Sequence, residues 1–139
     1  MYAGAVKNTN GELQGWQQFS AQQRDQATVM AVKQDVKLLN EQVIHYTVEK
    51  PLQTLIKKYA LQAENIDYFL PHYSSQFFRD KVQTGLQRVG LDIPQSRWFT
   101  NLSTCGNTGS ASIYIMLNAL FRSGRLKKGE RLLCYVPES

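Results

Sequence analysis

Helix-like and strand-like hydrophobic patterns alternate along this chain, and this alternation restricts its fold more than any other feature. From about Ala27, apolar residues recur every three or four positions, as on one face of a helix. The stretch Ile66–Leu70 is short, rich in β-forming residues and stopped by Pro71, which is typical of a buried strand. The order helix, strand, helix, strand, helix, strand predicts an α/β protein with a largely parallel sheet.

The remaining elements follow from capping residues, prolines and apolar runs. Pro51 interrupts a helical pattern, so we expect either a bend there or a new helix with Pro51 in its first turn. Further expected elements are a helix capped by Ser74 or Ser75 and running to about Val89, a short strand around Arg97–Thr100, a buried helix from Gly109 to about Ser123, and a buried strand at Leu132–Val136.

The chain divides into a short polar segment and one domain-sized remainder. Residues 1–26 are rich in Gln and show no clear period, so we interpret them as a loop or insertion segment. Residues 27–139 are expected to form one unit that is incomplete at its end, because the chain stops directly after a strand. An apolar fraction of 42% over 139 residues is enough for a real core.

Cysteine usage and hydropathy exclude several classes of protein. The two cysteines, Cys105 and Cys134, have neither metal-ligand spacing nor a disulfide framework, and we expect no metal site. Cys134 alternates within an apolar strand and is expected to be a small buried hydrophobic residue. No signal peptide and no membrane-spanning run is visible, so a cytoplasmic protein without membrane contact is expected.

The net charge of +5 is concentrated near the end of the chain. One interpretation of this cluster is a solvated helix end, where cations complement the helix dipole. The other is a landing surface for an acidic partner. No nucleic-acid-binding motif accompanies the cluster, so no nucleic acid partner is expected. Glu130 is the one acidic residue within this stretch. The cations of the cluster are Arg122, Arg125, Lys127, Lys128 and Arg131.

Two polar residues are placed where an α/β sheet usually carries its site, beyond the carboxyl ends of the strands. His72 follows the strand that Pro71 ends, and Asn107 precedes the expected central helix. Small residues around Asn107 would leave its amide at a helix N-terminus with little bulk nearby. Such an amide suits an oxyanion or enolate, because the helix dipole also favours developing negative charge.

These motifs resemble those of β-ketoacyl–acyl-carrier-protein synthase III, a condensing enzyme of the thiolase superfamily. Pro71-His72 and the later Gly106-Asn107-Thr108-Gly109-Ser110-Ala111-Ser112 resemble the paired signatures of that family, and the segment from Gly124 to Leu133 is similar to its last turn and long strand. The resemblance covers roughly residues 27–136. It implies the C-terminal half of a thiolase-like fold, with a mainly parallel sheet and a buried central helix.

The resemblance implies an acyltransferase that forms carbon–carbon bonds by decarboxylative Claisen condensation, in fatty-acid or polyketide-type synthesis. His72 and Asn107 would be catalytic, hydrogen-bonding the malonyl thioester carbonyl, and Ser75 and Gly106 would bind substrate. The substrates would be acyl-CoA and the phosphopantetheine thioester of acyl carrier protein, with no tightly bound cofactor. The full-length form would be a homodimer.

Two departures from the family pattern keep a second hypothesis open. The family's nucleophilic Cys belongs to the N-terminal half, so we expect this chain alone to be inactive. Ser75 stands where the family usually has an Asn that helps to bind pantetheine. The variant Tyr73-Ser74-Ser75 resembles the sequence of family members from specialised metabolism. Cys105 is a weaker candidate nucleophile, since His72 is the only evident base. The alternative is a non-catalytic half-domain that binds a partner ketosynthase or carrier protein.

Overall fold

The computed structural model describes residues 2–137, which form two compact units with the boundary between Glu41 and Gln42. The first unit contains regular structure where a loop was expected. A hairpin of β1 (Ala5–Lys7) and β2 (Leu13–Gly15) is followed by α1 (Ala21–Gln26). Ser20 caps α1 by accepting a hydrogen bond from the backbone N–H of Gln23, whose side chain bonds back to the Ser20 N–H.

The first long helix begins later than the hydrophobic pattern predicted. α2 spans Val36–Ile44, so the expectation of a helix from about Ala27 is wrong for the residues before Val36. Asp35 fixes the start of α2, because its carboxylate accepts a hydrogen bond from the Leu38 N–H at 3.0 Å. Lys33 is held outside the helix by its backbone pairing with Tyr2.

Pro51 lies in the first turn of α3 (Lys50–Tyr59), and the helical backbone continues into α3 from the segment before it. This π-helical segment, His45–Glu49, joins α2 to α3. A proline early in α3 has no N–H to offer the preceding turn, and the wider π-helical turn lies next to this interruption.

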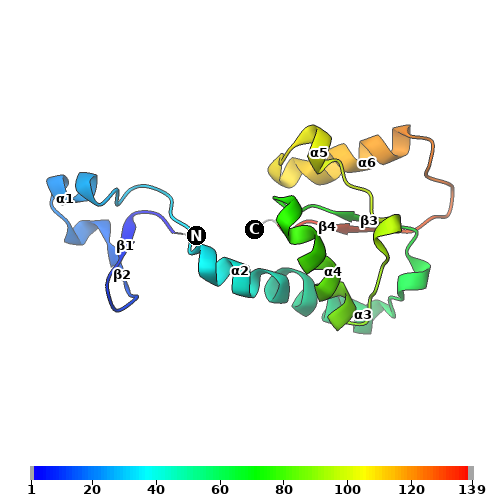
Figure 1. The fold of residues 1–139 in the computed structure, drawn as a ribbon, viewed down its shortest axis with the longest axis horizontal. Coiled ribbons are helices and arrows are strands. Elements are labelled where there is room, and N and C mark those ends of the chain that lie inside the picture. Colours follow the sequence, from blue (N-terminus) through cyan, green and yellow to red (C-terminus); the bar gives the residue numbers. More distant parts are fainter. Residues whose placement is uncertain (1, 138–139) are drawn as a thin grey trace. The chain divides into compact units, whose positions relative to one another are not determined.

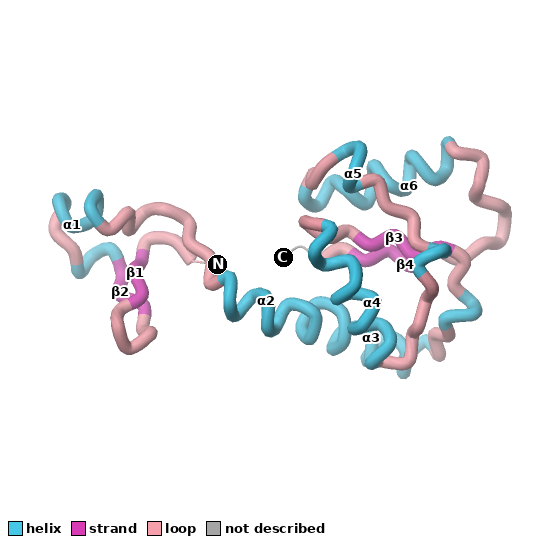
Figure 2. Tube along the Cα trace, in the orientation of Figure 1, coloured by secondary structure: helices cyan, strands magenta, loops and turns pink. Residues whose placement is uncertain are grey.

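The second unit contains a parallel pair of strands. β3 (Tyr68–Pro71) pairs with β4 (Leu132–Tyr135), with Tyr68 opposite Leu132 and Pro71 opposite Tyr135. The two strands lie side by side in Figure 2. Between them in sequence come α4 (Arg79–Arg88), the short α5 (Leu102–Cys105) and α6 (Ser112–Arg122). The predicted parallel α/β arrangement is therefore confirmed.

Helices cover both faces of this sheet, as Figure 1 shows, with α5 and α6 on one side and α3 and α4 on the other. Successive side chains of β3 point to opposite faces of the sheet and so contribute to two separate hydrophobic clusters. Phe69 packs with Leu86, Trp98 and the residues of α3, α4 and the π-helical segment, whereas Leu70 packs with Met116 on α6. The second unit is thus a three-layer α/β/α arrangement.

Two local expectations need correction. Arg97–Thr100 forms no strand: a 3-10 turn occupies Gln95–Arg97, and only one parallel bridge joins Trp98 to Phe69. The Trp98 indole N–H donates to the Ile93 carbonyl at 2.9 Å, which ties this segment to the preceding loop. Cys134 is exposed rather than buried, although partial shielding of its thiol raises the thiol pKa.

The expected central helix is buried on one face only. A 3-10 turn, Gly109–Ala111, precedes α6, so α6 proper begins at Ser112. Ile113 and Met116 face the core, whereas Tyr114 and Phe121 are 73% and 75% exposed.

Gly85 allows α4 to approach the π-helical segment closely. A Cβ atom at Gly85 would lie 2.6 Å from the Ile44 Cγ2 atom and 3.1 Å from the Val48 Cγ1 atom. Gly85→Ala is therefore expected to lower the free energy of unfolding by about 1–3 kcal/mol, because α4 and the branched side chains of Ile44 and Val48 would have to move apart. Urea denaturation followed by circular dichroism measures this, and unchanged stability would show that the two segments can move apart.

Candidate active site

His72 lies immediately after β3, at the carboxyl end of this parallel strand. Its side chain is buried, with 4% of the residue exposed. Its backbone N–H donates to the carbonyl of Tyr135 at 2.8 Å, which extends the β3–β4 ladder by one more bond. The sheet itself therefore fixes the position of His72.

Asn107 lies in the loop between α5 and α6 and is exposed. Its side-chain Oδ1 accepts a hydrogen bond from the Gly109 N–H at 3.0 Å. Because this bond engages the carbonyl end, the Nδ2 group is left as the donor of the carboxamide. The arrangement fits both an ordinary turn-stabilising Asn and an amide prepared to donate to a developing oxyanion.

A small cavity beside His72 joins residues that are far apart in sequence. Its volume is about 10 Å³, which is room for about one water molecule. Gly106 lines it from the loop before α6, with a φ of +71° that favours glycine. The parallel pairing of β3 and β4 and the packing of α6 on Leu70 thus bring the His72 and Gly106 segments together.

The other predicted site residues lie outside this cavity. Its lining includes neither Asn107 nor Ser75. Ser75 is exposed, and its hydroxyl accepts a hydrogen bond from the Phe77 N–H at the turn before α4. Cys105 is exposed at the last residue of α5, also outside the lining, and its Sγ lies 3.8 Å from the Thr104 hydroxyl. The roles given to Asn107 and Ser75 remain proposals.

Four polar residues of the cavity lining were not predicted as site residues: Tyr73, Thr100, Asn101 and Ser112. Ser112 is 5% exposed, and its hydroxyl lies 2.8 Å from that of Thr108. Tyr73 is 4% exposed, and its buried hydroxyl has no hydrogen-bond partner among residues 2–137. The buried Nδ2 group of Asn101 also lacks a partner among these residues. Asn101 stands among the polar residues Thr100, Ser103 and Thr104, so no sequence pattern distinguished it from its neighbours.

Within the described part of the chain, no three His, Cys, Asp or Glu side chains gather as metal ligands would. No helix in that same part has the length and apolar character to span a bilayer.

Comparisons with known proteins show the family and the fold of the chain. The profile of the family described as 3-oxoacyl-[acyl-carrier-protein (ACP)] synthase III C terminal matches residues 56–136. A chloroplastic β-ketoacyl-[acyl-carrier-protein] synthase III B of Cuphea wrightii is 35% identical over 82 residues, which are 59% of this chain and 19% of that protein. A β-ketoacyl-[acyl-carrier-protein] synthase III of Clostridium perfringens is 34% identical over 86 residues, 62% of this chain and 25% of that protein.

Solved structures of the same kind of enzyme share the fold. A synthase III of Thermus thermophilus superposes with a TM-score of 0.59 at 25% identity, covering 78% of this chain and 33% of that one. The 3-oxoacyl-[acyl-carrier-protein] synthase III of Aquifex aeolicus VF5 has a TM-score of 0.59 at 19% identity, covering 95% of this chain and 35% of that one. This chain therefore spans a third or less of most of these relatives.

The matched region includes β3, His72, the Gly106-Asn107 loop, α6 and β4, so the family profile and the structure describe the same elements. With the fold of the C-terminal half of a thiolase-like protein and a family match over more than half of its residues, the chain belongs to the 3-oxoacyl-[acyl-carrier-protein] synthase III family, C-terminal region.

Proposed function

We propose that the protein carrying this chain is a condensing acyltransferase, which joins an acyl thioester to a malonyl–carrier-protein thioester in fatty-acid or polyketide-type synthesis. The observation that carries the proposal is the burial of His72 at the end of β3, in one cavity with Gly106 of the Gly-Asn-Thr segment. A buried imidazole N–H beside a loop of small residues suits the stabilisation of charge on a thioester oxygen.

The chemistry assigned to this chain is the stabilisation of an enolate. The bond from the malonyl carbon to its carboxylate breaks, carbon dioxide leaves, and the electron pair forms the enolate of the remaining thioester. His72 and the Asn107 Nδ2 group donate hydrogen bonds to the enolate oxygen. The enolate carbon then attacks an acyl group held as a thioester on a Cys of the N-terminal half, and that Cys thiolate departs.

Binding of the substrates involves the same loops. Gly106 has no heavy atom within 4 Å of the position that a Cβ would take, so it adds no bulk on the side from which a thioester would approach. Ser75 lies on the loop after His72, where a pantetheine arm would pass. Acyl-CoA and acyl carrier protein are the proposed substrates, with no tightly bound cofactor. A cytoplasmic homodimer is the proposed state of the protein.

The test of this function is an assay of the protein produced from its native reading frame. It is supplied with an acyl-CoA and a malonyl–carrier protein labelled in the free carboxylate. Release of labelled carbon dioxide together with a 3-oxoacyl–carrier product supports the proposal. If the malonyl thioester stays intact while the protein is folded, the proposed function is wrong.

A second candidate function is supported by the outer face of α6. Tyr114 and Phe121 lie seven residues apart on this helix and are both largely exposed. Exposed aromatic side chains on one helix face are typical of protein contact surfaces. Under this alternative the chain binds a partner ketosynthase or carrier protein without turnover. Pull-down with such a partner and no release of carbon dioxide would favour it over catalysis.

A further inference from the structure

Tyr135, the last residue of β4, is held through both its backbone and its side chain. Its backbone carbonyl accepts the hydrogen bond from the His72 N–H at 2.8 Å. Its side-chain hydroxyl lies 2.7 Å from the hydroxyl of Thr47, a residue of the π-helical segment. Tyr135 therefore connects the backbone of His72 to the helical layer on one face of the sheet.

The protons of this Thr47–Tyr135 hydroxyl pair can be assigned. The Oγ1 atom of Thr47 also lies 2.6 Å from the carbonyl oxygen of Val43, which can only accept a hydrogen bond. Because a threonine hydroxyl has one proton, Thr47 donates to Val43 and Tyr135 donates to Thr47. Burial raises the pKa of Tyr135, which keeps this donor protonated.

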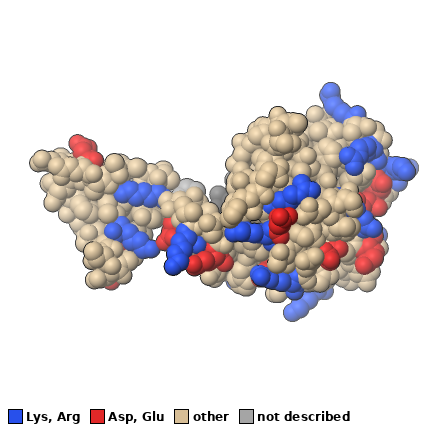
Figure 3. All heavy atoms as spheres, in the orientation of Figure 1, with Lys and Arg blue, Asp and Glu red and all other residues tan. Residues whose placement is uncertain are grey.

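The segment that carries Thr47 is itself firmly packed. Val48 is fully buried, and a Cβ atom at Gly85 on α4 would lie only 3.1 Å from its Cγ1 atom. Glu49 binds the guanidinium of Arg88 at 3.0 Å, and Figure 3 shows Asp and Glu side chains among Lys and Arg on the surface of the second unit. The segment can therefore serve as a fixed anchor for Tyr135.

The hydroxyl pair and the cavity beside His72 involve different faces of the sheet. Tyr135 packs in the cluster of Phe69, Val48 and the residues of α3 and α4, with its ring centre 6.2 Å from that of Phe69. The cavity is lined from the other face by Ser112 and Met116 of α6. Neither Thr47 nor Tyr135 lines the cavity, so any effect on a bound substrate is exerted through His72.

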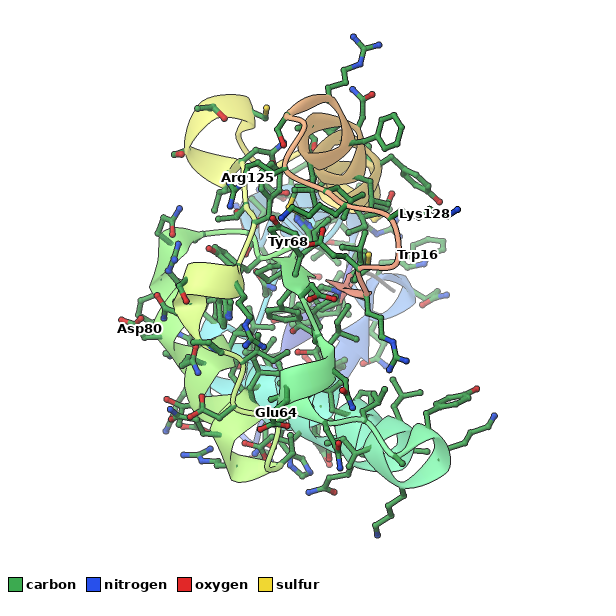
Figure 4. All side chains as sticks on the ribbon, turned by 90° about the vertical axis from the view of Figure 1, so that its right-hand side faces the viewer. Trp16, Glu64, Tyr68, Asp80, Arg125 and Lys128 are labelled. Atoms are coloured by element: carbon green, nitrogen blue, oxygen red, sulfur yellow. The ribbon has the colours of Figure 1, made fainter. Side chains whose placement is uncertain are left out.

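The end of the ladder is the place where such an anchor matters. β3 ends at Pro71 and β4 ends at Tyr135, and the bond from the His72 N–H closes the pairing between them. Strand ends open at little cost in free energy unless other contacts hold them. At the opposite end of β3, the Tyr68 hydroxyl bonds to the Arg125 carbonyl at 3.4 Å, and Figure 4 labels both residues.

We propose that Thr47 and Tyr135 are positioning residues for His72, because their hydrogen bond fixes the strand end to which the His72 N–H is bonded. The consequence for turnover rests on the function proposed above, in which His72 donates to a thioester oxygen. A displacement of about 1 Å can cost about 100-fold in rate. Release of one strand end, which leaves the rest of the sheet intact, should cost about three- to tenfold.

The first measurement is amide hydrogen exchange at His72, followed by NMR on the isotopically labelled protein. Tyr135→Phe keeps the ring and removes its hydroxyl, and Thr47→Val replaces the other hydroxyl with a methyl group. Each should raise the exchange rate of the His72 amide about five- to tenfold, the effect of one net hydrogen bond. Thr47→Ser keeps the hydroxyl and should leave the rate within about twofold of the original value.

Two comparisons separate this local effect from a general loss of stability. The Phe99 N–H donates to the Phe69 carbonyl at 2.9 Å on the other edge of β3, and its exchange should not change in these variants. Tyr68→Phe is the matched variant, because it removes a tyrosine hydroxyl from the far end of the same strand. It should change exchange at His72 by less than about twofold.

The second measurement is carbon dioxide release from malonyl–carrier protein by the protein from its native reading frame. Tyr135→Phe and Thr47→Val should lower kcat about three- to tenfold, with KM changed by less than about twofold, and Thr47→Ser should retain kcat. An unchanged kcat despite faster exchange at His72 would refute the positioning role. If the unsubstituted protein releases no carbon dioxide, the proposed function is wrong, and the exchange rates still decide whether the hydroxyl pair holds His72.

Three exchange results would overturn the proposal. One is unchanged exchange at His72 in folded Tyr135→Phe and Thr47→Val proteins. Another is an equal rise at Phe99, which would indicate that the whole sheet has become less stable. The third is an equal rise at His72 in Thr47→Ser or Tyr68→Phe, because the hydroxyl pair is intact in both variants.

Discussion

His72→Ala is expected to slow the release of carbon dioxide from malonyl–carrier protein by about 100- to 1,000-fold, because it removes one donor from the developing enolate. His72 is almost fully buried at the end of β3, so its replacement removes a donor that the sheet holds in a fixed position. The measurement uses the protein from its native reading frame and carboxylate-labelled substrate. The effect should appear in kcat more than in KM, since the hydrogen bond strengthens as charge develops.

His45→Ala is the matched control for this experiment. His45 is the other histidine of the chain, its side chain is 52% exposed, and it pairs with Glu49 on the surface of the π-helical segment. We expect its replacement to leave carbon dioxide release unchanged. Retained release in a folded His72→Ala protein would contradict the role assigned to His72.

Phe69→Ala is expected to lower the free energy of unfolding by about 3–5 kcal/mol, enough to unfold much of a marginally stable protein. Phe69 is fully buried in the centre of β3, and its ring meets that of Trp98 edge to face at 5.0 Å. Truncation would leave a cavity between the sheet and the layer formed by α3 and α4. Urea denaturation followed by tryptophan fluorescence measures the loss.

Phe121→Ala provides the comparison, because Phe121 is 75% exposed on α6. Its replacement should change the free energy of unfolding of the isolated chain by less than about 0.5 kcal/mol. Similar losses for the two variants would mean that the core does not lie where the structure places it.

The order of helices and strands could be predicted because it is written in local patterns. β3 combines β-forming aromatic residues with a terminal proline, and β4 is a short apolar run after a turn. Local patterns gave wrong secondary structure where contacts with residues distant in sequence determine the backbone conformation. The segment before α2 follows the helical period, yet pairing with Tyr2 and capping by Asp35 keep it irregular. Near Trp98 the residue types favour a strand, but only one bridge to Phe69 forms.

The part of the candidate site that lies at the ends of the strands could be predicted from the sequence. His72 had to lie at the carboxyl end of β3, and parallel pairing with β4 places the neighbouring loops at the same edge. The partners of the cavity could not be predicted, because the contributions of Asn101 and Ser112 depend on how α5 and α6 pack. The exposure of Cys134 likewise depends on a sheet edge that the alternation of the strand does not reveal.

The most direct test of the central claim, that His72 and Asn107 act on one oxygen, is a double-mutant cycle measured by carbon dioxide release. Its variants are His72→Ala, Asn107→Ala and the combination, each checked for native circular dichroism. Two donors to a single enolate oxygen act as a unit, so the double variant should be little slower than the more impaired single variant. Unchanged release in Asn107→Ala, or losses that simply multiply, would show that the two residues do not share one oxyanion and would contradict the account.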